Sequence, residues 1–224
     1  MVRASEVWNK QWKSERKYKE RHRYSYSFRR IKEEIKKRLK KEEIKVCEFG
    51  CGGGEWLLWI KNEYDAQIYG VDRSKRGLEI AKSKVGGDLR YEDIRKTSFK
   101  SNSFDFVFGI GLLEHFPKEE IIKILNEQKR VLKPGGVVMN TLPNLSKFSL
   151  LWISRIFKKR DERTIERGEL MGECLSAGLK DIEIIPCGLF IPKLRNKRWF
   201  SRLNLRFLEN FKTSDNIVAF ARKW

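Results

Sequence analysis

Five short apolar segments are spaced through the middle of the chain, and polar or glycine-containing stretches separate them. The segments are rich in valine, isoleucine, phenylalanine and tyrosine, which are typical of β-strands, and each is too short for an average helix. Each segment therefore predicts a strand. The five predicted strands are residues 44–49, 66–72, 88–94, 103–111 and 137–142.

Amphipathic segments lie between these predicted strands. Residues 55–64, 74–85 and 117–132 repeat apolar side chains at helical spacing, and Pro117 suits a first helical turn. The sequence KPGG at 133–136 predicts a turn before the fifth strand. Strands that alternate with helices in this order favour the α/β class, with a parallel sheet covered by helices on both faces.

The C-terminal part of the chain continues this pattern with two more helices and two more strands. Residues 146–160 and 166–179 are helix-like, and residues 180–187 and 216–224 predict the sixth and seventh strands. A basic, aromatic-rich insertion, residues 188–215, separates these two strands. The complete pattern predicts a Rossmann-like sheet of seven strands that is mainly parallel.

The N-terminal segment, residues 1–43, predicts a helical cap on a main domain of residues 44–224. Within it, Ile31, Ile35 and Leu39 recur on one face of a helix. The segment either closes over the main domain as a lid that excludes water or packs against the sheet as an ordinary helix. The aromatic residues that would form the lid are Trp8, Trp12, Tyr18 and Tyr24.

The net charge of +19 is concentrated in the two ends of the chain. Residues 1–45 carry 17 lysines and arginines against 7 acidic residues, and residues 146–224 carry 17 against 9. Residues 46–145 are almost neutral, with 15 against 14. Basic flanks suit an anionic partner, either RNA or an anionic membrane surface. They also suit the lysine- and glutamate-rich surface of a thermophile protein, which implies no such partner.

The chain lacks the long apolar segment of a membrane protein. No apolar run approaches the roughly 18 residues that a membrane-spanning helix needs, and the N-terminus has no apolar signal-peptide core. We therefore expect a cytoplasmic protein, with a peripheral position at a membrane left open. The cysteine spacing does not suit a zinc site, so we expect no metal. Cys47 and Cys174 are expected to serve as small buried hydrophobic residues.

Four glycines fall within five positions just after the first predicted strand. A glycine-rich loop between a strand and a helix lets a ligand approach the backbone and directs helix N–H groups toward it. The pattern is Glu48-x-Gly50-x-Gly52-x-Gly54, and the following Glu55 would repel the pyrophosphate of a dinucleotide. A ligand with a cationic amino group fits better, because Glu48 can accept a hydrogen bond from it.

Five motifs accompany the five predicted strands in order, namely CEFGCGGGE, YGVDRS, YEDIRKTSF, FDFVFGIGLLEHF and, just before the fifth strand, RVLKPGG. Their joint order and spacing are far more specific than the glycine loop alone. On these motifs, residues 44–141 resemble the class I S-adenosylmethionine-dependent methyltransferases, and most of all their small-molecule (type 11-like) group. The resemblance implies S-adenosyl-L-methionine as cofactor, S-adenosyl-L-homocysteine as product, and an antiparallel final strand.

The resemblance also implies which residues contact the cofactor. Asp72, 24 residues after Glu48, is suited to bind both ribose hydroxyls. Asp93 is suited to the adenine amino group, and the backbone N–H of Ile94 to the adenine ring. The full set of implied cofactor residues is Glu48, Phe49, Gly50, Cys51, Gly52, Gly54, Asp72, Arg73, Asp93, Ile94, Gly109 and Ile110.

The region after the fourth strand holds the candidate for catalysis. Methyl transfer from a sulfonium requires an aligned nucleophile and removal of its proton where it has one. Glu114 and His115 lie there, and His115 is the candidate general base because imidazole titrates near neutral pH. Alternatively, His115 caps or orients the loop before Pro117. No NPPY-type motif occurs, and the Pro186-Cys187 pair is in the predicted sixth strand, which disfavours methylation of DNA bases or of pyrimidine C5 in RNA.

Three functions are compatible with these features. The segment after the fifth strand is similar to that of the ubiquinone-pathway O-methyltransferases, which favours a small-molecule or lipid-like acceptor methylated on oxygen. The basic flanks suit an RNA acceptor, above all tRNA. The absence of an obvious base suits a non-catalytic S-adenosylmethionine-binding subunit. The predicted helix after the fifth strand either admits a lipid from a membrane or packs over the site, and its apolar face is Phe148, Leu151, Trp152, Ile156 and Phe157.

Overall fold

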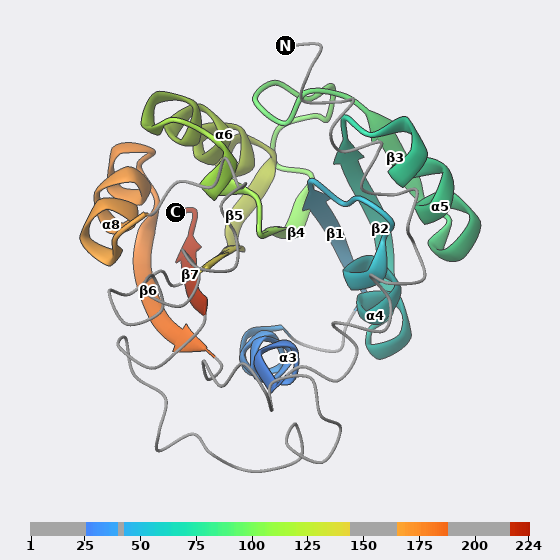
Figure 1. Ribbon diagram of the computed structural model, residues 1–224, viewed down its shortest axis with the longest axis horizontal. Helices are drawn as coiled ribbons and strands as arrows, with labels where there is room; N and C mark the ends of the chain where they lie inside the picture. The colour runs from blue at the N-terminus through green and yellow to red at the C-terminus, as the bar shows by residue number, and fades with distance from the viewer. Residues whose placement is uncertain (1–25, 40–42, 144–164, 188–215) are drawn as a thin grey trace, which may run out of the picture.

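A computed structural model describes residues 26–39, 43–143, 165–187 and 216–224 of the chain (Figure 1). The helices and strands, in chain order, are α3 (Tyr26–Arg38), β1 (Ile44–Phe49), α4 (Glu55–Glu63), β2 (Ala66–Asp72), α5 (Lys75–Val85), β3 (Asp88–Tyr91), β4 (Phe104–Ile110), the 3₁₀ helix η2 (Leu113–His115), α6 (Lys118–Val131), β5 (Leu132–Pro143), α8 (Arg167–Ser176), β6 (Lys180–Cys187) and β7 (Asn216–Arg222).

The strands of the described residues form one seven-stranded sheet in the order β3-β2-β1-β4-β5-β7-β6 (Figure 1). β1 pairs in parallel with β2 and β4, and the parallel pairing continues to β3 on one side and to β5 on the other. β7 is antiparallel to both of its neighbours, β5 and β6. The prediction of a mainly parallel seven-stranded sheet with an antiparallel last strand is confirmed.

Both faces of the sheet are apolar and covered by helices. In β4, Phe106 and Phe108 pack in a core with α3, α4 and α5, whereas Val107 packs in a second core with α6 and α8. In β7, Val218 belongs to the first core and Ala219 to the second. Because successive strand residues point to opposite faces, a strand buried on both faces is apolar at nearly every position. The helices accordingly lie in two layers on either side of the sheet (Figure 1).

Helix α3 packs against the sheet near β6 and β7. Ile31 and Ile35 are buried in the same core as α4 and α5, as their helical spacing predicts. The guanidinium of Arg38 lies 3.9 Å from the centre of the Phe220 ring and forms an ion pair with Glu183 of β6 at 2.5 Å. Residues 26–38 of the predicted cap are thus a helix on the sheet, whereas the aromatic residues proposed for a lid lie outside the described residues.

The structure differs from the predicted elements at two places. β3 ends at Tyr91, so residues 92–94 lie beyond the strand, where Asp93 and Lys96 form an isolated antiparallel bridge. The predicted turn at 133–136 lies within β5, and its Gly135 has a left-handed φ of +76°. β5 pairs with β4 on both sides of this irregularity. The KPGG sequence therefore forms a bulge within the strand and does not end it.

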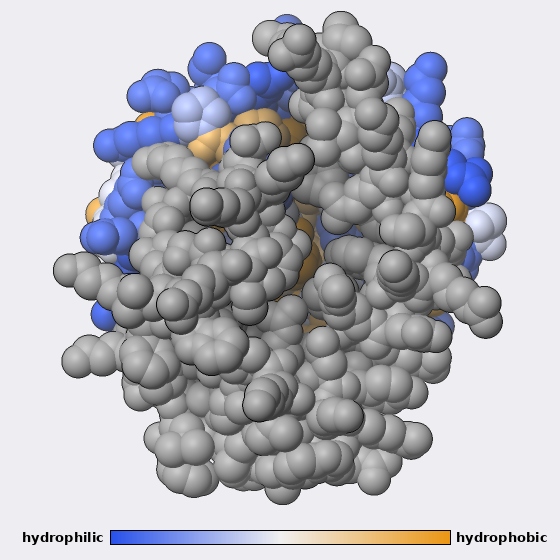
Figure 2. Space-filling model, in the orientation of Figure 1, coloured by the Kyte–Doolittle hydropathy of each residue, from blue (hydrophilic) through white to orange (hydrophobic). Residues whose placement is uncertain are grey.

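Several expectations concern the surface and small clusters. In the described ranges, no helix is both long enough and apolar enough to cross a membrane. Within the same residues no group of histidine, cysteine and acidic side chains could hold a metal ion. Cys47 and Cys174 are buried thiols, as predicted. The described residues at the edge of the face seen in Figure 2 are mainly hydrophilic, whereas most apolar side chains belong to the cores and Tyr91, Leu175 and Trp224 are exposed. The predicted helix 146–160 and insertion 188–215 lie outside the described residues.

Candidate cofactor site

The candidate site lies at the carboxyl ends of the parallel strands. The chain order reverses beside β1, which has β2 on one side and β4 on the other (Figure 1). In open parallel sheets such a reversal leaves a crevice at the carboxyl ends of the strands, where ligands bind. Glu48 and Phe49 end β1, Asp72 ends β2, and Gly109 and Ile110 end β4. The sheet order therefore brings together residues that the sequence separates widely.

The glycine-rich loop is fixed to β2 by backbone hydrogen bonds. The N–H groups of Gly50 and Cys51 donate to the carbonyl of Val71 at 2.8 and 3.1 Å. Gly54 has a left-handed φ of +76°, and a Cβ at this position would lie 3.0 Å from Cβ of Ala81 in α5. Part of the glycine pattern thus serves the close packing of α4 against α5, in addition to any approach of a ligand.

Glu48 is a buried carboxylate with an uncommitted oxygen. The residue is 3% exposed, and the backbone N–H of Leu57 acts to lower the pKa of its carboxyl, against the effect of burial. Among the described residues, Oε2 of Glu48 has no hydrogen-bond partner. Burial raises the pKa of Glu48 well above its ordinary value, and the charges of Glu55 and Asp72 raise it further. A buried acceptor of this kind fits a cationic amino group, which would satisfy the oxygen and stabilise the ionised form.

Asp72 connects the glycine loop with the start of α5. Its Oδ2 accepts from the N–H of Gly52 at 2.8 Å, and its Oδ1 accepts from the N–H of Ser74 at 2.6 Å. Ser74 in turn caps α5 by accepting from the N–H of Gly77 at 3.0 Å. Burial raises the pKa of Asp72, although the backbone N–H groups act in the opposite direction. Since each carboxylate oxygen has two lone pairs, both oxygens can still accept a ribose hydroxyl.

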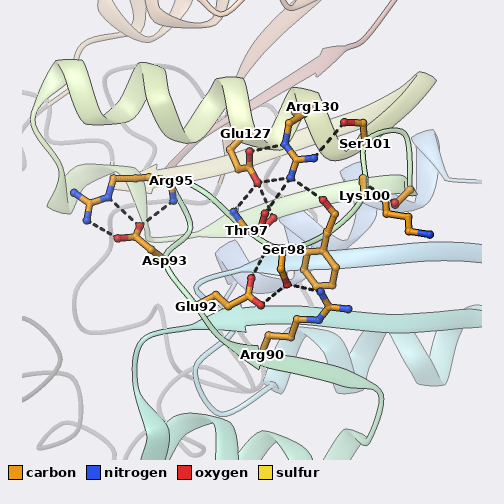
Figure 3. A network of polar contacts seen from close by, with 12 residues as sticks. Arg90, Glu92, Asp93, Arg95, Thr97, Ser98, Lys100, Ser101, Glu127 and Arg130 are labelled. Atoms are coloured by element: carbon orange, nitrogen blue, oxygen red, sulfur yellow. Dashed lines mark hydrogen bonds and ion pairs between the residues drawn. The ribbon is translucent and has the colours of Figure 1, made fainter.

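Asp93 is engaged by an arginine that the sequence reasoning missed. Arg95 Nε donates to Oδ1 of Asp93 at 2.9 Å and Arg95 Nη2 donates to Oδ2 at 2.5 Å (Figure 3). Arg73 Nη1 lies 3.5 Å from the same Oδ2, and Arg95 also bonds Glu120 of α6 at 2.7 Å. The hydrogen bonds from Arg95 hold the pKa of Asp93 below its ordinary value. The adenine contact expected of Asp93 stays a prediction, and it would share the carboxylate with Arg95.

A second polar cluster holds the rest of this segment on α6. Glu127 accepts from the N–H and the hydroxyl of Thr97 at 2.7 and 2.6 Å and from Arg130 Nη2 at 2.7 Å (Figure 3). Arg130 Nη2 also donates to the carbonyl of Phe99 at 2.8 Å. Burial alone would raise the pKa of Glu127, but the hydrogen bonds from Arg130 and Thr97 outweigh burial and lower it. The segment that carries Asp93 is therefore held against α6 by these hydrogen bonds.

The carboxyl ends of β4 and β5 form the other side of the site. The N–H of Gly111 lies 3.1 Å from the carbonyl and 3.2 Å from the hydroxyl of Thr141. Glu114 is buried in η2, and the adjacent His115 is half-buried at the end of this short helix. The backbone N–H of His115 donates to the carbonyl of Leu112 at 3.3 Å. The catalytic role of His115 stays a prediction.

The predicted cofactor residues divide into two groups. Some offer polar side chains at strand ends, as Glu48 and Asp72 do, whereas the side chains of Phe49, Cys51 and Ile94 are buried in the cores. The sequence reasoning assigned no role to five further residues: two lie inside quoted motifs beside their partners Asp72 and Asp93, and the other three have partners on other elements. These residues are Ser74, Lys84, Arg95, Gln128 and Asn140.

The comparisons with known proteins agree with this geometry. Residues 46–136 match the family model of a methyltransferase domain. A demethylmenaquinone methyltransferase of Staphylococcus aureus (strain MRSA252) is 33% identical over 103 residues, which are 43% of this chain and 42% of the relative. The same enzyme of strain JH9 is 31% identical over 118 residues, which are 50% of this chain and 46% of the relative.

Solved structures resemble the whole fold. An S-adenosylmethionine-dependent methyltransferase from Thermotoga maritima, described as a possible histamine N-methyltransferase, has a TM-score of 0.74 at 21% identity and covers 98% of this chain and 99% of its own. Geranyl diphosphate C-methyltransferase from Streptomyces coelicolor, in complex with S-adenosyl-L-homocysteine, has a TM-score of 0.64 at 13% identity and covers 86% and 78%. At these identities the two structures support the fold alone.

Residues 46–136 are therefore similar to a methyltransferase domain, and the mainly parallel sheet with its antiparallel β7 agrees with the resemblance to the class I S-adenosylmethionine-dependent methyltransferases. S-adenosylmethionine is the cofactor of this class, and the uncommitted oxygen of Glu48 and the carboxylate of Asp72 fit its ammonium and ribose groups. The chain spans less than half the length of the curated relatives that it matches. The acceptor is therefore a matter for proposal.

Proposed function

We propose that the chain methylates a small, lipid-like acceptor, with oxygen as the expected acceptor atom and S-adenosylmethionine as the methyl donor. The observation that carries the donor is the buried Glu48, with its uncommitted oxygen, beside the glycine loop and Asp72. The match to demethylmenaquinone methyltransferases supports a lipid-like acceptor. The oxygen preference rests on the similarity of the segment after residue 143 to O-methyltransferases, and this segment lies outside the described residues.

The chain's own residues would hold the cofactor at the strand ends. Glu48 would accept from the ammonium group, Asp72 from the ribose hydroxyls, and the backbone around Ile94 would contact the adenine. When bound, S-adenosylmethionine supplies a methyl group activated on a sulfonium. The protein's remaining tasks are to align the acceptor, exclude water and take up any proton that the acceptor loses.

Apolar side chains at the end of β4 favour an apolar acceptor. Ile110, Leu112 and Phe116 are partly buried and pack against the two cores next to η2. His115 is the last residue of η2, the short helix that follows β4. It is the proposed general base for an acceptor hydroxyl. An acceptor that has no proton to lose at the reacting atom would not need this base.

The proposal is tested with radiolabelled methyl-S-adenosylmethionine and a cell extract separated into organic-soluble, small polar, RNA and protein fractions. The wild-type chain is expected to place label in the organic fraction, and the product's mass spectrum and NMR spectrum then identify the methylated atom. Label in RNA alone would overturn the lipid-like acceptor, and a C-methyl or N-methyl product would overturn the oxygen preference. The RNA alternative stays a prediction, because the flanks that motivate it lie largely outside the described residues.

Substitution of Asp72 tests donor binding, and substitution of Asp105 provides the control. Asp72→Ala is expected to weaken S-adenosylmethionine binding by roughly 1.5–3 kcal/mol, the range for hydrogen bonds to a charged group. Asp105→Asn, near the amino end of β4 and so opposite the carboxyl ends of the strands, should leave the affinity unchanged in the same calorimetric experiment. Equal affinities of all three proteins would contradict the assignment of Asp72 to the ribose. Binding without turnover for every fraction would instead favour the non-catalytic subunit.

A further inference from the structure

Three carboxylates from different elements surround the glycine-rich loop. Glu48 belongs to β1, Asp72 to the end of β2, and Glu55 is the first residue of α4. They lie within electrostatic reach of one another, because the charges of Glu55 and Asp72 both act on Glu48. The buried Oε2 of Glu48 has no hydrogen-bond partner among the described residues, so a cationic group placed beside it would satisfy this oxygen.

A lysine from α5 partly offsets this negative charge. Lys84 Nζ lies 3.3 Å from Glu55 Oε1 and 3.4 Å from the carbonyl oxygen of Gly53 in the glycine loop. The side chains of Lys84 and Glu55 are 17% and 25% exposed. Because both are largely removed from water, their charges are screened less than those of surface pairs and act over a longer distance.

We propose that Glu55 and Lys84 together set how strongly the site prefers S-adenosylmethionine to S-adenosylhomocysteine. This inference rests on the proposed function. The two ligands differ by one methyl group and by the positive charge on sulfur. The contacts that both ligands share cannot distinguish them, whereas the electrostatic field of the charged residues around the loop can. Glu55 favours the cationic ligand, and Lys84 limits this preference.

The balance has a consequence for turnover. A field that stabilises the cationic ligand strongly also stabilises the state before methyl transfer, and only interactions that are stronger in the transition state accelerate the reaction. A site without Lys84 would discriminate well against the product but would hold the reacting cation more tightly. A site without Glu55 would bind the cationic donor more weakly and would discriminate less against the product. We therefore expect the Glu55–Lys84 pair to act as a compromise between capture of the donor and over-stabilisation of the reacting cation.

Titration calorimetry of the two ligands tests this proposal directly. The quantity measured is the ratio of Kd for S-adenosylhomocysteine to Kd for S-adenosylmethionine. Glu55→Gln should lower the ratio, and Lys84→Met should raise it, each by about two- to ten-fold for a charge acting through partly screened protein. The double variant E55Q/K84M should return the ratio close to that of the wild type, and added salt should reduce each change.

The Asp105–Lys133 ion pair provides matched controls. The distance between Lys133 Nζ and Asp105 Oδ1 is 2.8 Å. The pair lies near the amino ends of β4 and β5, whereas the site lies at the carboxyl ends of the strands. Asp105→Asn and Lys133→Met should leave the ratio unchanged. The ratio isolates charge, because a loosened glycine loop would weaken the binding of both ligands together. Since the two site variants move the ratio in opposite directions, either one tests the proposal if the other fails to fold.

The possible outcomes separate this inference from the proposed function. If the wild type binds neither ligand, the proposed function itself fails. If the wild type binds both ligands and the site variants leave the ratio unchanged, the inference is overturned and the proposed function stands. A ratio that moves equally in the control variants would also overturn it, because a general change of net charge would then explain the effect.

Discussion

Gln128 of α6 and Asn140 of β5 exchange two hydrogen bonds between their buried side-chain amides. Gln128 Nε2 donates to Asn140 Oδ1 at 3.2 Å, and Asn140 Nδ2 donates to Gln128 Oε1 at 2.9 Å. Asn140 pairs with Gly109 of β4, and a Cβ at 109 would lie 2.8 Å from Asn140 Oδ1. The amide pair therefore joins α6 to the strand ends that border the cofactor site, and glycine at 109 makes room for it.

Removal of one amide should destabilise the fold. Gln128→Leu leaves the buried amide of Asn140 without this partner and is expected to lower the free energy of unfolding by about 1–3 kcal/mol. Denaturant unfolding measures the change. Asn126→Leu, at an exposed position of the same helix, is the control and should change stability by less than about 0.5 kcal/mol. Equal effects of the two variants would show that the amide pair contributes nothing specific.

Gly54 should resist substitution for two separate reasons. Gly54→Ala places a side chain in a left-handed conformation and brings its Cβ to 3.0 Å from Ala81. Gly135 also has a φ of +76°, but a Cβ there would meet nothing within 4 Å, so Gly135→Ala carries the backbone strain without the crowding. G54A is expected to lower the free energy of unfolding by about 1–3 kcal/mol more than G135A, the usual range for overpacking. Thermal or denaturant unfolding of both variants would decide this, and similar losses would contradict the packing argument.

Glu48 should make stability depend on pH. Its pKa in the folded chain is raised well above 4.5, chiefly by burial, so the folded state holds the proton more tightly than the unfolded state. This contribution is fully present below the unfolded pKa and is lost as pH rises through the folded pKa. The free energy of unfolding of the wild type should therefore fall relative to that of Glu48→Gln as pH rises above about 4.5. Denaturant unfolding of both proteins across this range tests the sign, and a constant difference would refute it.

Cofactor binding provides a second test of the ionisation of Glu48. A cationic ligand favours the ionised form of Glu48, so binding of S-adenosylmethionine should release protons at a pH below the raised pKa. Calorimetry in buffers of different ionisation enthalpy counts these protons. E48Q should release fewer, and an equal count in both proteins would mean that Glu48 does not titrate on binding.

His115 is the residue whose role most needs a kinetic test. If it removes a proton from the acceptor, His115→Asn should lower kcat by about 10²–10⁴-fold, the range for a general base. The rise of kcat with pH that deprotonation of a general base produces should be lost at the same time. A structural role in η2 would instead change stability or KM and keep the pH profile. Retention of kcat and of the profile by H115N would rule out the general base.

Local patterns predicted most of the fold. The bounds of β1, β2 and β6 agree to the residue with the predicted segments 44–49, 66–72 and 180–187, because glycine, acidic and other polar residues end these apolar runs. The prediction was less accurate where pairing overrides a local signal. β5 begins at Leu132 and continues through KPGG, because β4 pairs with it on both sides of the turn sequence.

The sequence by itself determined the order of strands and helices, the glycine loop and the carboxylates at the ends of β1 and β2, because these depend on spacing along the chain. Only the tertiary structure decided which side chains meet across that order. Lys84 reaches Glu55 from 29 residues away, and Asn140 pairs with Gln128 from another element. Such contacts depend on how two helices, or a helix and a strand, pack together. No local sequence pattern around any of these four residues indicates its partner.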